Sequence, residues 1–178
     1  MKTIIFDIDG TLTDMWPIEE AVLLYMTNGK YKEKINALKL SGISDTYKIY
    51  KQVWDKNISK KNYFNFYNKS FNKLIINNKL PAVKKYPLVK WIRNNVNKYN
   101  FVYATGGQRL ETLYVLRKLG LLAYFDIKNS IDKSNCRFSK KTGIPFNMIK
   151  KKFNDCLLIT DSRNDCTGAV LVKVPFIL

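Results

Sequence analysis

The sequence predicts an α/β protein, with a parallel β-sheet covered by helices on both faces and an all-helical insert. Short apolar runs typical of buried strands occur at residues 2–7, 101–104 and 156–159. Segments with apolar residues at helical spacing lie between the runs at 101–104 and 156–159, and another such segment follows 156–159. Residues 15–84 carry helical patterns but no strand-like run, which predicts the insert. Helices that alternate with apolar strands favour a parallel sheet buried on both faces.

The insert shows three apolar stripes at helical spacing, with breaks at Ser41-Gly42 and at residues 57–59. The stripes consist of Ile18, Ala21, Val22, Tyr25 and Met26, then Tyr47, Tyr50 and Trp54, then Phe64, Tyr67, Phe71, Leu74 and Ile75. We expect the aromatic residues to form a small core of the insert's own. The predicted domains are therefore a core domain over 1–14 and 85–178, and a helical domain over 15–84.

Further elements follow in order from Pro87. A helix is predicted from the spacing of Leu88, Trp91, Ile92 and Val96, and another from Leu110, Leu113, Leu116 and Leu119, ended by Gly120. Residues 124–127 form a weaker apolar run that predicts a strand. A helix is then expected over 144–153, another from about Asn164, and a last short strand over 174–178.

Composition limits the classes of function. The chain has 178 residues with 46% apolar content, which is typical of a folded core of ordinary size. No apolar run approaches a membrane span of about 20 residues, and the amino end lacks the apolar stretch of a signal peptide. Three cysteines without metal-like spacing fit a reducing compartment. We therefore expect a cytoplasmic protein with no membrane partner.

The absence of histidine excludes catalysis by Ser-His-Asp or Cys-His groups and metal sites built on histidine. Acid–base chemistry must then come from Asp, Glu, Lys or Tyr. The net charge of +17 favours anionic partners, such as a small phosphorylated substrate or nucleic acid. Lysine is also abundant together with Asn, Ile, Tyr and Phe throughout the chain, so genome composition is an alternative source of this charge. The sequence does not set the oligomeric state.

Two acids directly follow the first apolar run, in the string Ile4-Ile5-Phe6-Asp7-Ile8-Asp9-Gly10-Thr11. If the strand continues to Asp9, both carboxylates share a face. If it breaks at Asp7, Gly10 lets the chain curl both acids around one point. Neighbouring carboxylates repel each other, so a metal or a shared proton is expected to hold them. The alternative is a strand that ends in an acidic Asp-Gly turn.

The string from Asp7 to Asp14 resembles the DxDGT motif of the haloacid dehalogenase superfamily of phosphatases. Two later segments resemble the superfamily's other motifs in the right order. One is a strand that ends in Thr105, and the other is Asp161 with Asp165, where Thr160 replaces the usual glycine of GDxxxD. The resemblance implies a Rossmann-like core, and it implies that the insert is a C1-type cap, which in the family closes over the site and helps to select substrate.

The resemblance also implies roles for individual residues, and parallel sheets bind ligands at the carboxyl ends of their strands. Asp7 would be the nucleophile, and Asp9 the general acid and base. Thr105 and the Gly106 amide would hold phosphate oxygens. The implied magnesium ligands are Asp7, Asp9, Asp161 and Asp165, with Asp165 acting directly, through water or by orienting a ligand. The remaining implied substrate-binding residues are Gly10, Thr11, Gly107 and Lys141.

The superfamily also uses a lysine between the Thr105 and Asp161 motifs. The usual pattern places this lysine six residues before an aromatic residue that opens a helix, and Phe146 then selects Lys140. The familiar Lys-Pro pair is missing, so Lys141 remains an alternative, with Lys133 as a more distant one.

The function implied by these motifs is magnesium-dependent hydrolysis of a phosphate monoester through an aspartyl-phosphate at Asp7. Asp9 argues against dehalogenation, because carbon–halogen cleavage needs no acid for its leaving group. A phosphomutase would use the same residues. The net charge favours a different hypothesis, a protein that binds nucleic acid or removes phosphate from its ends. A catalytically idle regulatory relative is also compatible with the sequence.

Overall fold

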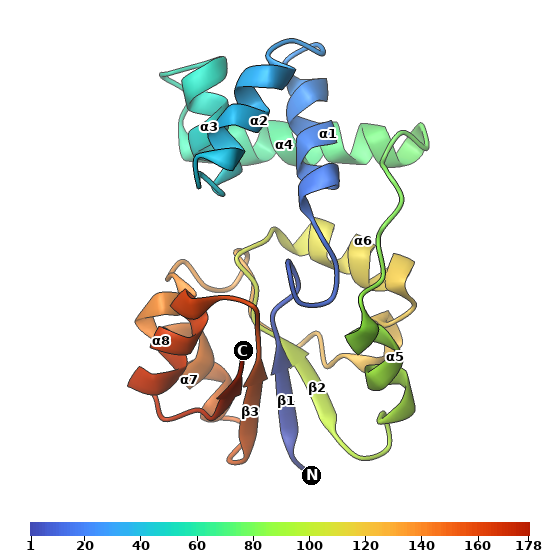
Figure 1. Ribbon diagram of the computed structural model, residues 1–178, viewed down its shortest axis with the longest axis vertical. Helices are drawn as coiled ribbons and strands as arrows, with labels where there is room; N and C mark the ends of the chain where they lie inside the picture. The colour runs from blue at the N-terminus through green and yellow to red at the C-terminus, as the bar shows by residue number, and fades with distance from the viewer. The chain divides into compact units, whose positions relative to one another are not determined.

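The computed structural model describes residues 1–178 and divides the chain into two compact units. The first unit combines Met1–Asp14 with Val83–Leu178, and the second is Met15–Ala82 (Figure 1). None of the helices has the length and apolar character needed to cross a membrane.

The first unit is built on a four-stranded parallel sheet in the order β2-β1-β3-β4. The strands are β1 Thr3–Phe6, β2 Asn100–Tyr103, β3 Cys156–Ile159 and β4 Phe176–Ile177. In the register of the sheet, Ile5 lies opposite Val102 on one side and Leu158 on the other. This topology confirms the predicted parallel α/β fold.

Helices cover both faces of the sheet (Figure 1). On one face, Ile5 and Leu158 pack with Phe146 of α7 (Ile144–Lys150) and Ala169 of α8 (Arg163–Leu171). Since neighbouring residues of a strand point to opposite faces, Phe6 lies on the other face. Its ring lies 6.5 Å from that of Trp91 in α5 (Pro87–Asn94). Helix α6 (Arg109–Leu119) is tied to α5, because Arg93 donates a hydrogen bond to the Leu119 carbonyl.

The predicted strand over residues 124–127 is wrong. Leu122–Tyr124 form a 3₁₀ turn, η1, and Phe125 makes a single bridge to Phe101. The Asp126 carboxylate accepts hydrogen bonds from the backbone and side-chain nitrogens of Asn129, at 3.2 and 2.7 Å. These bonds close a turn, so the next backbone bridge forms only at Ile131, which pairs with Ala104 just after β2. Phe125 is buried, as expected for a strand residue, but its single bridge does not extend into a ladder of strand hydrogen bonds.

The second unit contains four helices: α1 Trp16–Met26, α2 Lys32–Leu40, α3 Thr46–Val53 and α4 Lys60–Ile76. Helices α3 and α4 begin at capping residues, Asp45 and Ser59, whose side chains accept backbone hydrogen bonds. The breaks expected at residues 41–42 and 57–59 are present. A further break at residues 27–31 separates α1 from α2. Helix α2 buries only Ile35, so the sequence lacks the row of buried apolar residues that would have indicated a separate helix.

Candidate active site

The first acidic motif turns away from the sheet as soon as β1 ends. The strand ends at Phe6, and Gly10 has a φ of +76°, which reverses the chain. Asp7 is buried and Asp9 is exposed. The strand therefore breaks at Asp7, as in the second of the two arrangements that the sequence left open.

The Asp7 carboxylate has one oxygen that is hydrogen-bonded and one that is not. Its Oδ1 accepts hydrogen bonds from the Ile8 amide at 2.8 Å and from Lys140 Nζ at 2.7 Å. Oδ2 accepts no hydrogen bond from the protein. Burial raises the pKa of Asp7 to about 7, opposed by the charge of Lys140 and assisted by that of Asp165.

Lys140 lies between two buried carboxylates. Its Nζ is 2.7 Å from Asp7 Oδ1 and 2.5 Å from Asp165 Oδ2, and its side chain is 15% exposed. Burial lowers the pKa of Lys140, but the two carboxylates more than offset this and raise it overall. Lys141 and Lys133 are exposed, and Lys141 makes no ion pair. Of the three candidate lysines, Lys140 is the one that reaches Asp7.

A glycine in α8 lets Lys140 take this position. Lys140 begins the 3₁₀ turn η2 (Lys140–Thr142), which packs directly against α8. A Cβ added at Gly168 would lie only 2.0 Å from the Lys140 carbonyl oxygen. The close approach of η2 to α8 therefore requires glycine at 168. Sequence reasoning missed this residue, although a glycine inside a helix is a signal of such close packing.

Thr160, which departs from the family's glycine, holds Asp165. Its hydroxyl donates to Asp165 Oδ2 at 3.0 Å and accepts from the Ser162 amide at 3.1 Å. Asp165 Oδ2 thus receives both the Thr160 hydroxyl and the Lys140 ammonium. The hydroxyl orients the carboxylate, a role that sequence reasoning did not identify.

Asp161 packs against the first motif. Its Oδ1 accepts a hydrogen bond from the Thr11 hydroxyl at 3.1 Å, and its backbone amide donates one to Thr11 Oγ1, also at 3.1 Å. A Cβ at Gly10 would lie 2.0 Å from Asp161 Oδ2, so only glycine allows this approach. Gly10 and Thr11, expected at the substrate, contact Asp161 in this structure.

The β2 loop, residues 104–108, lies beside the first motif. Ala104 donates to the Phe6 carbonyl at 2.9 Å, which places the loop at the same edge of the sheet as Asp7. The Thr105 hydroxyl accepts from the Gly107 amide at 3.1 Å. No atom lies within 4 Å of a Cβ added at Gly106, so the space at this residue is open. The loop therefore offers a hydroxyl and an accessible backbone beside Asp7.

The acidic residues fit a magnesium ion by the chemistry of their donors. No three acidic or cysteine side chains in residues 1–178 gather closely enough to hold a metal on their own. Magnesium needs fewer protein ligands, because it keeps several waters and is bound through one or two carboxylates plus substrate phosphate. Asp7 and Asp161 supply hard oxygen donors of this kind, while Asp165 is paired with Lys140.

Solved structures share this fold. A HAD hydrolase of family IA, variant 3, from Entamoeba histolytica has a TM-score of 0.71 at 18% identity, with 99% of this chain and 82% of that chain covered. A protein from Thermotoga maritima that is provisionally assigned as a β-phosphoglucomutase has a TM-score of 0.68 at 21% identity, with 98% and 82% covered. A provisionally assigned phosphoglycolate phosphatase from Lactobacillus plantarum has a TM-score of 0.62 at 18% identity, with 99% of this chain and 86% of that chain covered. At these identities the likeness concerns the fold alone.

Comparisons of this amino-acid sequence with known proteins identify the family of the chain. No curated protein matches the chain significantly. The family model described as haloacid dehalogenase-like hydrolase matches residues 1–172. With nearly the whole chain matched and the fold shared, this protein belongs to the haloacid dehalogenase-like hydrolase family.

Proposed function

We propose that the protein is a magnesium-dependent phosphatase that hydrolyses a phosphate monoester through an aspartyl-phosphate at Asp7. The observation that carries this proposal is the Asp7 carboxylate, which has Lys140 at 2.7 Å on one oxygen and no hydrogen-bond partner on the other. A buried carboxylate with one free oxygen beside a fixed cation suits nucleophilic attack on an anionic group.

In the first half-reaction, Asp7 Oδ2 attacks phosphorus, and the bond from phosphorus to the leaving oxygen breaks. Asp9 gives a proton to that oxygen, so the leaving group departs as a neutral alcohol. The exposed position of Asp9 in the turn after β1 is compatible with reaching a leaving group. In the second half-reaction, Asp9 takes a proton from water, which attacks phosphorus and releases phosphate from Asp7.

The surrounding residues stabilise the transferred group. Lys140 keeps a positive charge beside Asp7, which offsets the negative charge that develops on the phosphoryl oxygens. Thr105 and the Gly106 amide would donate to two of those oxygens. Magnesium would be held by Asp7, Asp161 and the Asp9 carbonyl, and it supplies electrostatic stabilisation of the phosphoryl group. Asp165 would act through its hold on Lys140.

Phosphate release from a generic aryl phosphate tests the proposal. The protein is assayed with magnesium and with chelator, beside the variant Asp7→Asn, which keeps the size of the side chain. We expect turnover that depends on magnesium and is lost in the variant. Turnover that survives Asp7→Asn would contradict the proposal. Measurable magnesium binding without turnover would instead favour a selective phosphatase or a phosphomutase, which uses the same residues.

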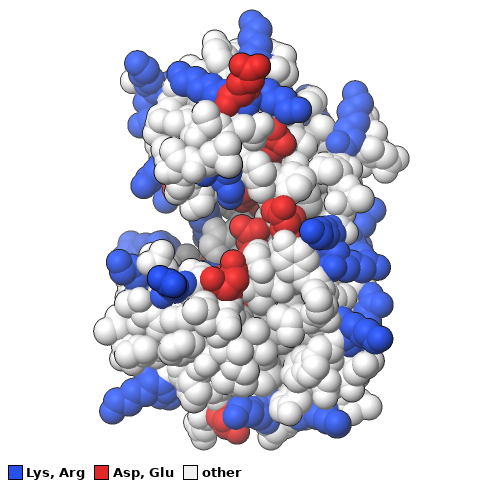
Figure 2. Space-filling view, viewed as in Figure 1, with Lys and Arg blue, Asp and Glu red and all other residues white.

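The second candidate is the same chemistry on phosphorylated ends of nucleic acid, which the net charge of +17 favours. On the face of each unit drawn in Figure 2, the Lys and Arg side chains lie in separate groups. Scattered charge of this kind attracts anions without selecting one class, so the small-molecule phosphatase ranks first. Binding to single-stranded DNA that weakens steeply with salt would favour the second candidate.

A further inference from the structure

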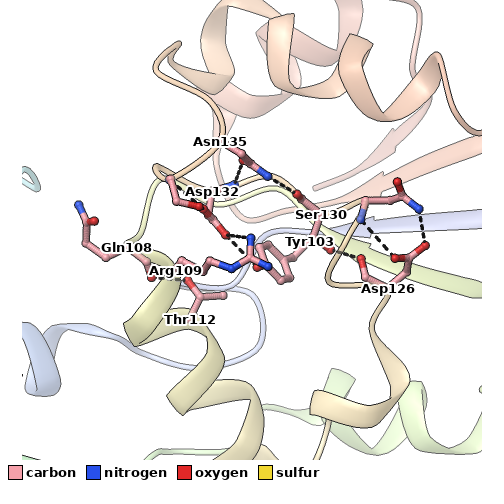
Figure 3. Close-up of polar contacts among 10 residues, drawn as sticks. Tyr103, Gln108, Arg109, Thr112, Asp126, Ser130, Asp132 and Asn135 are labelled. Atoms are coloured by element: carbon pink, nitrogen blue, oxygen red, sulfur yellow. Dashed lines mark hydrogen bonds and ion pairs between the residues drawn. The ribbon is translucent and has the colours of Figure 1, made fainter. Parts of the chain in front are cut away.

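Asp132 is a buried carboxylate that the proposed mechanism does not use. Its side chain has 0% exposure, and it lies in the segment that follows η1 and runs beside the end of β2 (Figure 3). A buried charge is unfavourable unless hydrogen bonds and an opposite charge compensate it. The groups that contact Asp132 therefore indicate what this charge holds in place.

Every oxygen of the Asp132 carboxylate has a partner. Oδ1 accepts from the amide of Ser134 at 2.8 Å and from its hydroxyl at 2.5 Å. Oδ2 accepts from the Tyr103 hydroxyl at 2.9 Å and lies 3.6 Å from Arg109 Nη1 (Figure 3). Tyr103 ends β2 and Arg109 begins α6, so these two partners stand at the two ends of the β2 loop.

The backbone around Asp132 follows the same loop. The Ser130 hydroxyl accepts from the Tyr103 amide at 3.0 Å, and the Ile131 carbonyl accepts from the Thr105 amide at 2.9 Å. Further along, the Lys133 amide donates to the Gly107 carbonyl at 3.2 Å. Residues 130–133 thus contact the loop at its start and near its end, and Asp132 is the buried acid among them.

We propose that Asp132 is a positioning residue for the β2 loop: one buried charge ties Tyr103 and Arg109 together and so sets where Thr105 and the Gly106 amide stand. The catalytic part of this inference rests on the proposed phosphatase function, since it assumes that the loop binds phosphate. The structural part, a loop held by this charge, does not depend on it. An amide at position 132 could still accept from Ser134, but its nitrogen would donate to the Tyr103 hydroxyl instead of accepting from it, and it could not form an ion pair with Arg109.

The test compares Asp132→Asn with the matched control Asp126→Asn. Asp126 lies in the same segment, but its carboxylate accepts hydrogen bonds only from Asn129 (Figure 3). Two quantities are measured in each full-length variant: amide hydrogen exchange over residues 104–108, and kcat and KM for an aryl phosphate. In Asp132→Asn we expect exchange over 104–108 to quicken about tenfold or more, and kcat to fall by about 10- to 100-fold with little change in KM. The control should match the wild type in both.

Amide hydrogen exchange over residues 104–108 distinguishes failure of this proposal from failure of the phosphatase assignment. If exchange over 104–108 is the same in Asp132→Asn, Asp126→Asn and the wild type, the positioning role is wrong, whatever the activity. If the wild type shows no turnover but exchange quickens in Asp132→Asn alone, the positioning role stands and the phosphatase assignment fails. If Asp132→Asn does not fold, Tyr103→Phe and Arg109→Gln replace it. Unchanged exchange in both of these would overturn the proposal.

Discussion

Two buried carboxylates in the core unit are each paired with a cation, and they differ in how many of their oxygens accept hydrogen bonds. Asp7 pairs with Lys140, and Asp132 pairs with Arg109. Asp132 accepts from donors on both of its oxygens, whereas Asp7 leaves Oδ2 without a hydrogen bond. The Lys140 ammonium also serves a second carboxylate, that of Asp165.

This difference indicates how one kind of contact serves two purposes. A buried carboxylate whose hydrogen bonds are all made is inert and fixes the groups around it. A buried carboxylate with a free oxygen and a raised pKa has the features of a reactive group. Burial and ion pairing are thus common to both carboxylates, and the oxygen without a hydrogen bond distinguishes Asp7 from Asp132.

Apart from loss of the nucleophile itself in Asp7→Asn, the largest effect is expected from Lys140→Met. The change removes the cation between two buried carboxylates and should lower kcat/KM by about 10²- to 10³-fold. It should also lower the free energy of unfolding by about 3–5 kcal/mol at neutral pH, because two buried charges lose their partner. Steady-state kinetics and denaturant titration measure the two effects.

Lys141→Met is the matched comparison, since Lys141 is the exposed neighbour and makes no ion pair. It should behave as the wild type in both measurements. A larger loss for Lys141→Met than for Lys140→Met would reverse the assignment of the lysine.

Gly168→Ala should come next, because its new methyl group would meet the Lys140 carbonyl oxygen at 2.0 Å. The turn η2 must then move away from α8 and carry Lys140 with it. We expect kcat/KM to fall by about 10²-fold, as for a misplacement of about 1 Å at a reacting group. Equal activity of Gly168→Ala and the wild type would show that η2 tolerates the shift.

Thr160→Val should have a smaller effect. Valine keeps the shape of threonine but removes the hydroxyl that donates to Asp165 Oδ2. Loss of this buried bond should lower the free energy of unfolding by about 1–3 kcal/mol, with a loss of about tenfold in kcat. Thr160→Ser, which keeps the hydroxyl, should recover most of both. If the serine variant is no better than the valine variant, the hydroxyl does not orient Asp165.

The last effect concerns pH. In magnesium-free protein, burial raises the pKa of Asp7 from 3.8 to about 7, so the folded state holds this proton more tightly than the unfolded state. Ionisation of Asp7 therefore destabilises the fold, and its contribution to the free energy of unfolding falls as pH rises from 3.8 to about 7. The difference between wild type and Asp7→Asn in denaturant titrations isolates this group. A difference that grows in favour of the wild type over the same range would contradict the raised pKa.

The sequence shows the sheet and the first motif because both depend on local signals. Ile4, Ile5 and Phe6 form a short apolar run, and Asp7 follows it directly. Helix α6 is likewise predictable, since Leu116 and Leu119 lie at helical spacing and Gly120 ends the helix with a φ of +68°. The strand expected over 124–127 fails because Asp126 closes a turn with Asn129, which competes with strand pairing.

The contacts that sequence reasoning missed come mostly from residues far apart in the chain. Asp132 stands in a polar segment, and its partner Tyr103 lies 29 residues away in the chain. Gly168 looks like an unfavourable residue within a helix until the Lys140 carbonyl is seen against it. The Thr160 hydroxyl acts only because Asp165, five residues later, turns back towards it.

Trapping the phosphorylated enzyme tests whether Asp7 is the nucleophile. The variant Asp9→Asn keeps Asp7 but removes the group that would activate water, so the aspartyl-phosphate should accumulate. The variant is incubated with magnesium and an activated aryl phosphate, quenched in acid, digested and analysed by mass spectrometry. We expect one phosphoryl group on Asp7, and none in the double variant that also carries Asp7→Asn. A phosphoryl group on any other residue, or one that persists in the double variant, would contradict it.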